Sequence, residues 1–258
     1  TQNCVVFVDE FKFSYFAAMD TMPDDVRKAI PALGFYPQPA ISTGTTLIAV
    51  EYDGGVVVGT DSRTSGGVFI SSRATNKINP ITDHLSVCRS GTAADTQAIS
   101  DIVKYYIETY SLLENEPVSI YRSAQIFRSF LYEYRDSLSA SVLVAGWDEK
   151  LGGQLYAIPI GGFTTRQRST ASGSGSTYVM GFLDKAWRPN LTKEECVEIV
   201  KTAVGLAVFR DGSSGGVIRI GVINKDGTNI TLHRPDKPGF PTVNLPAPHP
   251  SFPLHVKQ

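Results

Sequence analysis

The sequence predicts an α+β fold in which helices cover β-sheets. Three observations support this prediction: a strand hairpin comes first, two amphipathic helical segments follow, and the chain then returns to strands around a third helix. A chain of 258 residues with 42% hydrophobic side chains can bury a sizeable core, either as one domain with extensions or as two small domains.

The first element is a hairpin of two strands over residues 46–52 and 56–61. The strands flank the tripeptide DGG at 53–55, which is typical of tight hairpins because primed turns need residues that tolerate positive φ. Strands that close around this turn pair residues whose numbers add up to roughly 107, so Thr46 should face the neighbourhood of Asp61. The next segment, RTSGGVFISSRATNKI, indicates another turn followed by extended chain.

Two helical segments follow, because apolar residues recur there at intervals of three and four. The first is predicted over residues 92–113, and the second begins after Pro117, a favoured residue at a helix start. The apolar face of the first helix comprises Ile99, Val103, Tyr106, Tyr110 and Leu113. The apolar face of the second comprises Ile120, Ala124, Phe127, Leu131, Tyr134 and Leu138.

Two strands, a third helix and a further strand complete the body of the chain. The strands SASVLVAGW and QLYAIPI flank a glycine-containing turn, and GGVIRIGVIN is the last predicted strand. The helix over residues 192–210 opens on Thr192, with Glu195 three residues later, which is a capping-box signature. After His233 the last 25 residues hold seven prolines, which predicts an extended arm, either disordered or laid over a neighbouring subunit.

Composition disfavours several classes of function. Net charge is -1 with no basic run, which disfavours a nucleic-acid surface, and no apolar run approaches the ~20 residues of a membrane span. The three cysteines, Cys4, Cys88 and Cys196, form no CxxC pair, so we expect a reducing compartment and neither a disulfide framework nor a metal site. The first residues lack a basic leader, so we do not expect a secretory signal.

Histidine chemistry is also disfavoured. His233, His249 and His255 lie in or beside the proline-rich tail, and only His84 lies in the body, where a loop histidine is the simpler interpretation. A Ser-His-Asp or Cys-His enzyme needs an imidazole in its core. The sequence contains no HExxH and no GxxxxGK[ST] motif.

Thr45 is the candidate nucleophile. A threonine hydroxyl needs a base, and one solution is the residue's own α-amine after the preceding bond is cut. An α-amine with a pKa of about 8 is roughly one-tenth neutral near pH 7, whereas a lysine is neutral in under about one molecule in a thousand. A nearby lysine would therefore serve better as a fixed positive charge than as the base.

Two further residues could complete a site with Thr45. The hairpin returns the Asp61 carboxylate to the neighbourhood of Thr45, although Asp61 could simply end a strand. Gly91 precedes the capping signature TAAD, so its N–H should lie at a helix start, where donors favour an oxyanion. An ordinary strand-to-helix turn is the alternative for Gly91.

Four segments together resemble one known family. TGTTLIAVEYDGGVVVGTDSRTSGGVFISSRATNKI, CRSGTAADTQA, GSGSTYVMGFLD and RDGSSGGVIR are similar to catalytic β subunits of the eukaryotic 20S proteasome, most of all the caspase-like type. The similarity covers about residues 43–222. It implies an N-terminal nucleophile hydrolase with a four-layer αββα sandwich, made as a precursor that cuts itself between Gly44 and Thr45.

The resemblance also implies a role for each matching residue. Thr45 would be the nucleophile and, through its freed amine, the proton shuttle. Asp61 and Lys77 would form the charge pair beside it, and the Gly91 amide would be the oxyanion donor. Ser174, Asp211 and Ser214 would support the amine and its water. No cofactor is implied.

Specificity would depend on Arg89, which the resemblance places at the base of the pocket for the substrate residue before the cut. A guanidinium there would attract aspartate or glutamate through charge-assisted hydrogen bonds. A structural ion pair is the alternative role for Arg89. The same pocket would be lined by Thr64, Thr75, Asn79, Ala93 and Gln97; Asn79 departs from the threonine expected in the family.

The resemblance divides the chain into a propeptide (1–44), a catalytic domain (45–233) and a proline-rich extension (234–258). It implies partners in stacked rings of α and β subunits, peptide and unfolded protein substrates, and ubiquitin-dependent proteolysis in cytoplasm and nucleus. Two alternatives stay open: a noncatalytic ring subunit, and a small-molecule amidohydrolase. Retention of Gly44, Thr45, Asp61 and Lys77 favours the catalytic interpretation, and Arg89 disfavours the amidohydrolase.

Overall fold

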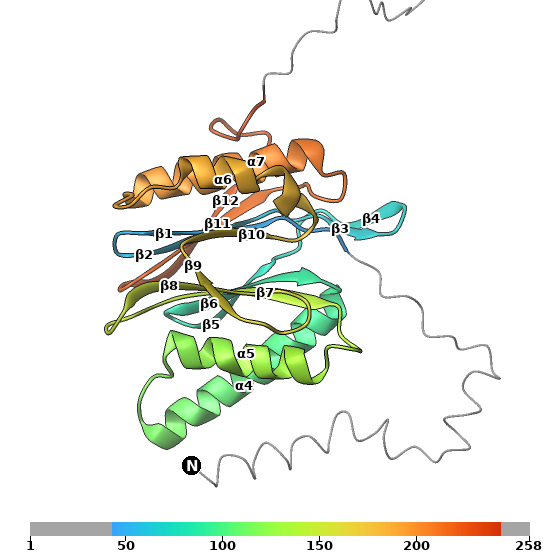
Figure 1. Cartoon of the computed structure of the whole chain (residues 1–258). Helices are drawn as coiled ribbons and strands as arrows, with labels where there is room; N and C mark the ends of the chain where they lie inside the picture. The colour runs from blue at the N-terminus through green and yellow to red at the C-terminus, as the bar shows by residue number, and fades with distance from the viewer. Residues whose placement is uncertain (1–42, 244–258) are drawn as a thin grey trace, which may run out of the picture. The chain divides into compact units, whose positions relative to one another are not determined.

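The protein folds into four layers, helices–sheet–sheet–helices (Figure 1). The computed structural model describes residues 43–243. The predicted propeptide, apart from its last two residues, and the tail from residue 244 lie outside the described residues. The predicted α+β class and four-layer sandwich are confirmed.

One of the two sheets contains both strands of the predicted hairpin. Its five strands pair antiparallel. In spatial order they are β10 (Ser169–Ser172), β1 (Leu47–Tyr52), β2 (Gly55–Thr60), β11 (Ile218–Asn224) and β12 (Gly227–His233).

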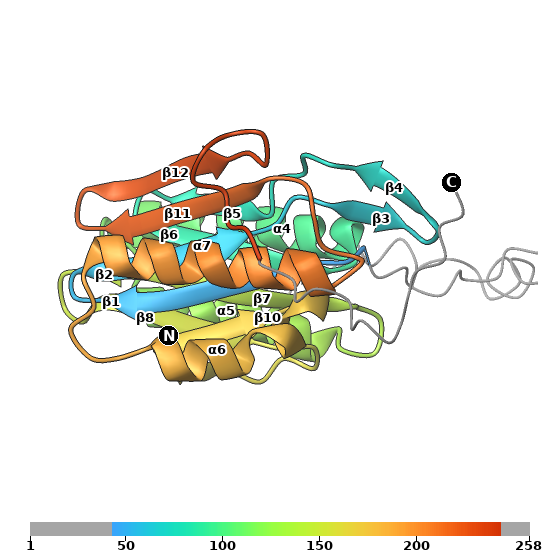
Figure 2. The same ribbon diagram turned by 90° about the horizontal axis from the view of Figure 1, so that it is seen from above.

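The second sheet is also antiparallel and has five strands. In spatial order they are β5 (Ile78–Thr82), β6 (Leu85–Gly91), β7 (Ala140–Asp148), β8 (Gly152–Ile158) and β9 (Thr165–Gln167). A separate ribbon of β3 (Thr64–Gly66) and β4 (Phe69–Ser72) projects from one end of the molecule (Figure 2).

Two helices cover the outer face of each sheet. On the second sheet they are α4 (Ala93–Glu114) and α5 (Ile120–Glu133), and on the first they are α6 (Met180–Ala186) and α7 (Lys193–Arg210) (Figure 1). A short 3-10 helix, η1 (Ser174–Tyr178), links β10 to α6. No helix between residues 43 and 243 combines the length and hydropathy that a bilayer crossing requires.

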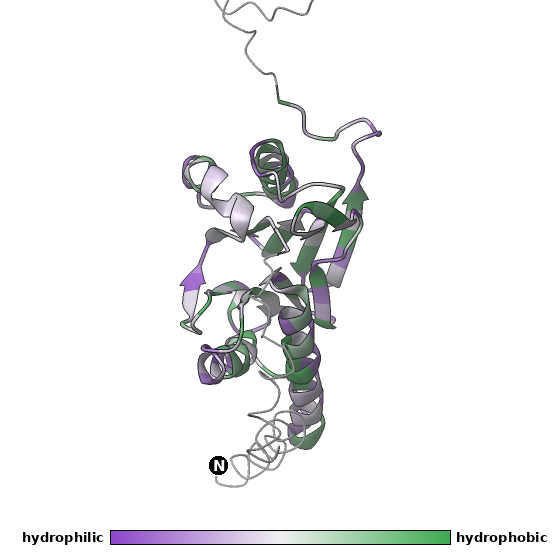
Figure 3. Ribbon diagram, turned by 90° about the vertical axis from the view of Figure 1, so that its right-hand side faces the viewer, coloured by the Kyte–Doolittle hydropathy of each residue, from purple (hydrophilic) through white to green (hydrophobic). Residues whose placement is uncertain are grey.

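Both faces of β1 are buried, which explains its continuous apolar run. Leu47 and Ala49 pack between the two sheets, whereas Ile48 and Val50 pack beneath α7. A strand buried on both faces needs no polar alternation. Figure 3 shows the same distribution, with largely hydrophobic strands in the middle layers.

The hairpin prediction is confirmed. Leu47 pairs with Thr60 and Tyr52 with Gly55, so paired numbers add up as the turn predicts. Just outside the ladder, the Asp61 N–H donates to the Thr46 carbonyl at 3.3 Å. The capping box of α7 is also confirmed, since the Thr192 and Glu195 side chains each accept from the other residue's backbone N–H.

The start and the apolar face of α4 differ from the prediction. Thr92 is the N-cap residue, but its side chain makes no capping hydrogen bond, and Asp95 instead accepts from the backbone N–H of Ser139. Ile107 is buried, whereas Leu113 is 77% exposed. Leu112 in the same turn is exposed as well, so this end of the helix lies outside the core formed by the described residues.

The proline-rich segment begins by folding back onto its own domain. Phe240 packs against the cluster beneath α7, and Pro241 lies so close to Gly205 of α7 that an added Cβ would meet it at 2.4 Å. The described part of this segment, residues 234–243, therefore covers α7 of the same chain. The predicted arm beyond it lies outside the described residues.

Candidate active site

Three strand ends bring the predicted nucleophile and its charge pair together. Thr45 precedes β1, Asp61 follows β2, and Lys77 precedes β5, so all three lie at one end of the facing sheets. The Lys77 ammonium is 2.8 Å from Asp61 Oδ1 and also donates to the Gly44 carbonyl at 2.8 Å. All three side chains are buried, so this ion pair is shielded from water.

The buried Asp61 carboxylate is held by hydrogen bonds on both oxygens. Oδ1 accepts from the Thr46 N–H at 2.9 Å in addition to Lys77. Oδ2 accepts from the N–H groups of Arg63 and Gly215, each at 3.0 Å. A fully buried charge needs such partners, and here they fix the carboxylate against Lys77.

The electrostatic environment of Lys77 has two opposing parts. Burial lowers the pKa of its ammonium below the ordinary value, and the charge and hydrogen bond of Asp61 raise it, with burial the larger effect. Asp61 therefore opposes the loss of the positive charge that lies against the Gly44 carbonyl.

The bond between Gly44 and Thr45 is intact in the structure. The Thr45 hydroxyl donates to the Gly44 carbonyl oxygen at 2.5 Å, so nucleophile and scissile carbonyl are in contact. Gly44 has a φ of +69°, and a Cβ there would lie 2.4 Å from the Cβ of Ser213. Only glycine fits this position, which explains the residue type before the predicted cut.

A hydrogen-bonded chain of hydroxyls leads from Thr45 to Asp211. The Thr45 N–H donates to Ser174 Oγ at 3.1 Å, and Ser174 Oγ donates to Asp211 Oδ2 at 2.7 Å. Ser214 Oγ donates to the same oxygen at 2.6 Å. Burial alone would raise the pKa of Asp211, but hydrogen bonds from Ser214, Ser174 and Ser213 outweigh it and lower the pKa. Asp211 is thus a stable acceptor for both serines.

Thr46 extends this chain, although it was not among the predicted site residues. Its hydroxyl lies 2.7 Å from Ser214 Oγ, whose single proton goes to Asp211, so Thr46 is the donor. Gly175 makes room for that hydroxyl, because a Cβ there would meet Thr46 Oγ1 at 1.9 Å.

Thr46→Val is expected to lower the free energy of unfolding by about 1–3 kcal/mol, because it leaves the buried Ser214 hydroxyl without its donor. Denaturant unfolding of the full chain measures this loss. Thr46→Ser keeps the hydroxyl and should lose less. Equal stability of Thr46→Val and the unmodified chain would show that this hydrogen bond contributes nothing.

Gly91 lies beside the site in a conformation that only glycine adopts without strain. It ends β6 with a φ of +112°, and a Cβ would meet the Ser139 carbonyl oxygen at 2.2 Å. Its own carbonyl accepts from the Thr43 hydroxyl at 2.8 Å. Among residues 43–243 its N–H does not donate to the Gly44 carbonyl, which instead accepts from Lys77 and Thr45. The oxyanion role of Gly91 stays a prediction.

A small cavity of about 30 Å³ adjoins Thr45 and contains Arg89 in its lining. Arg89 donates to the Asn76 carbonyl at 3.2 Å, and its buried Nε has no partner in the described part of the chain. Burial lowers the pKa of the guanidinium, although Asp101 and Cys88 raise it. No carboxylate within residues 43–243 forms an ion pair with Arg89, so the structural ion-pair alternative finds no support there.

The lining of this cavity includes part of the predicted pocket. Thr64, Thr75 and Ala93 line the cavity as predicted, but Asn79 and Gln97 do not. Asn79 lies two residues beyond Lys77 along an extended strand, about 6–7 Å further from the site. Gln97 lies one turn into α4 with its side chain exposed. Residues that line the cavity without having been predicted are Thr43, Asn76 and Thr96.

The fold and the site define the class of N-terminal nucleophile hydrolase folds: a four-layer sandwich with a threonine at the start of the central hairpin. A sequence model described as "Proteasome subunit" matches residues 41–223. The chain belongs to the proteasome β subunit family.

Named relatives support this assignment over most of their length. The chain is 47% identical to "Proteasome subunit beta type-6" of Dictyostelium discoideum, over 80% of this chain and 94% of the relative. It is 45% identical to "Proteasome subunit beta type-6" of Arabidopsis thaliana, over 76% and 84% of the two chains. It is 43% identical to "Proteasome subunit beta type-1" of Saccharomyces cerevisiae, over 76% and 91%. Membership of this family implies assembly with other proteasome subunits in rings.

Proposed function

We propose that the chain is a threonine endopeptidase subunit that frees its own nucleophile by cutting between Gly44 and Thr45. The observation that carries the proposal is the contact of two donors with one carbonyl oxygen. The Thr45 hydroxyl and the Lys77 ammonium both donate to the Gly44 carbonyl oxygen, and Asp61 holds Lys77 there. A noncatalytic subunit would have no need of a buried cation at this bond.

Self-cleavage begins when Thr45 Oγ attacks the Gly44 carbonyl carbon. Negative charge develops on the carbonyl oxygen, where Lys77 stabilises it. The carbon–nitrogen bond then breaks, the nitrogen takes up the proton lost by the hydroxyl, and an ester links Gly44 to Thr45 Oγ. Water hydrolyses this ester and releases the propeptide from a free threonine amine.

The same groups would cut peptide substrates. The freed amine lies beside Ser174, which is fixed by Asp211, and can take the proton of the Thr45 hydroxyl as the oxygen attacks the substrate carbonyl. The amine then donates the proton to the leaving nitrogen. An acyl ester remains on Thr45, and water hydrolyses it.

Two measurements test this proposal in the assembled particle. Mass spectrometry should find a native N-terminus at Thr45, and fluorogenic peptides with an acidic residue before the cut should be hydrolysed. An intact propeptide together with no peptidase activity of this subunit in a mature particle would instead identify a structural subunit.

The proposed preference for acidic residues depends on Arg89, which lines the cavity beside Thr45 and whose buried Nε has no partner in the described residues. Arg89→Gln is expected to lower kcat/KM for post-acidic peptides about 10- to 100-fold, the size of a lost hydrogen bond between charged groups. Cleavage after neutral residues should change little. A loss of stability with the same substrate preference would show that Arg89 has a structural role only.

A further inference from the structure

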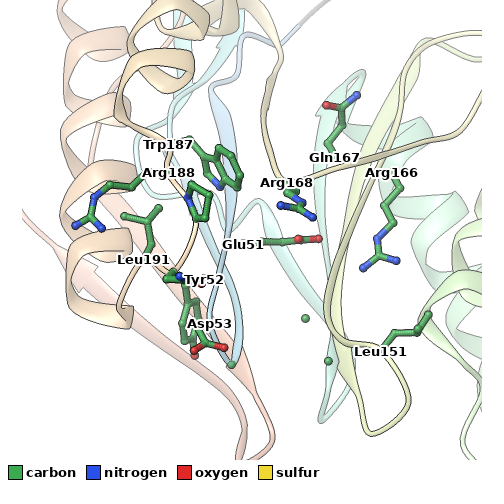
Figure 4. A pocket seen from close by; sticks show the side chains of 15 residues that line it. Glu51, Tyr52, Asp53, Leu151, Arg166, Gln167, Arg168, Trp187, Arg188 and Leu191 are labelled. Atoms are coloured by element: carbon green, nitrogen blue, oxygen red, sulfur yellow. The ribbon is translucent and has the colours of Figure 1, made fainter.

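A second and larger cleft lies at the opposite end of β1 from the candidate active site. Its volume is about 740 Å³, and four segments form its walls: 51–54, 151–153, 166–168 and 187–191. Figure 4 shows the Glu51 carboxyl group between Arg166 and Arg168, with Trp187 beside Arg168. We infer that this cleft binds an extended peptide segment carrying acidic side chains at alternate positions.

The two arginines provide the charge and the spacing for such a segment. Arg166 and Arg168 are separated by one residue around the end of β9, and Figure 4 shows Gln167 directed away from both. Alternate residues of extended chain are about 6–7 Å apart, so acidic residues at positions i and i+2 of a bound peptide would match this spacing. Bidentate pairing of guanidinium with carboxylate makes such contacts strong.

Burial raises the pKa of the Glu51 carboxyl group and the charges of Arg166 and Arg168 lower it, so both guanidinium groups already interact electrostatically with Glu51. These two guanidinium groups donate no hydrogen bond and form no ion pair within residues 43–243. Arg168 lies over the Trp187 ring, 5.6 Å from its centroid. Arg188, by contrast, is paired with Glu195. The two guanidinium groups therefore keep most of their donors for a ligand.

The wall also contains unpaired polar atoms that suit a peptide backbone. Trp187 Nε1 and Glu51 Oε1 are buried and have no partner in the described residues, one a donor and the other an acceptor. A peptide offers both kinds of partner, whereas an inorganic anion offers acceptors only. The cleft is also of the size that accommodates drug-sized ligands, which is much larger than a single phosphate ion.

The strand next to the cleft can accept an added chain. β9 is the edge of its sheet, so one side of its backbone has no neighbouring strand in the described structure. Extended peptides add to such edges through main-chain hydrogen bonds, and side-chain contacts then give specificity. The free edge of β9 and the two arginines together favour a peptide ligand over a compact anion.

The test is fluorescence anisotropy of a labelled peptide of about eight residues with the central sequence Asp-Ser-Asp, titrated with the full chain. We expect saturable binding, at least about tenfold weaker for a matched Asn-Ser-Asn peptide and for the Arg166→Gln/Arg168→Gln double variant. Arg135→Gln, an exposed charge change in the turn that follows α5, should bind like the unmodified chain. Glu51→Gln should bind more tightly, because it removes the carboxylate that lies between the two arginines and repels the ligand.

Three results would overturn the inference. They are equal affinity for the Asp and Asn peptides, full affinity in the double variant, and equal binding of an oligonucleotide or polyphosphate, which would indicate a general anion site. Should the double variant fail to fold by circular dichroism, the comparison of the two peptides on the unmodified chain still decides. Thr45→Ala should bind normally, so the result does not depend on the proposed peptidase function.

Discussion

Thr45→Ala is expected to leave the bond after Gly44 uncut and to abolish post-acidic peptide cleavage by this subunit, a loss of about ten-thousand-fold or more. The reason is that the Thr45 side chain supplies the attacking oxygen for both reactions. Thr45 is buried, and among residues 43–243 no other hydroxyl is in contact with the Gly44 carbonyl. Mass spectrometry of the assembled subunit measures the first effect, and hydrolysis of fluorogenic peptides measures the second.

Thr45→Ser is the matched control, because it keeps the hydroxyl and removes only a methyl group. It should be processed and should cleave peptides, although more slowly. A particle that carries Thr45→Ala and still loses its propeptide, with the new terminus directly after Gly44, would require another nucleophile and would contradict the proposed function.

The sequence predicted the hairpin and the long elements because local chemistry determines them. The DGG turn fixed the register that places Thr46 opposite Asp61, and Thr192 with Glu195 marked the start of α7. β5, β6, β9, β10 and α6 were not predicted, since three to seven residues carry too little periodicity to recognise. It also missed β12, whose mostly exposed residues show no buried alternation.

The residues of the candidate site were also predicted only in part. Asp61 follows from hairpin arithmetic, but Lys77 could not be placed by spacing, because the β3–β4 ribbon intervenes between the two residues. Thr46 and Asn76 were not predicted as site residues. Their sequence neighbours, Thr45 and Lys77, are the residues whose chemistry can be recognised from the sequence. The contribution of Thr46 and Asn76 depends on contacts with Ser214 and Arg89, which only the folded chain brings near.

The role of Lys77 can be decided by the direction in which pH changes the rate of self-cleavage. If the ammonium stabilises charge on the Gly44 oxygen, the rate falls as pH rises through the pKa of Lys77, which burial lowers from its ordinary value of 10.5. If neutral Lys77 instead removed the hydroxyl proton, the rate would rise through the same pKa. Mass spectrometry of precursor conversion at a series of pH values separates the two.

Substitutions at Lys77 sharpen this test. Lys77→Met is expected to slow self-cleavage about 100- to 1000-fold, the effect of removing one donor to a developing oxyanion. Lys77→Arg keeps a charge that does not titrate, so where it folds it should retain part of the activity and lose the fall at high pH. Because Asp61 raises the pKa of Lys77, Asp61→Asn should move that fall to lower pH. An inactive Lys77→Arg with a normal fold, together with a rate that rises with pH in the unmodified chain, would assign Lys77 as the base.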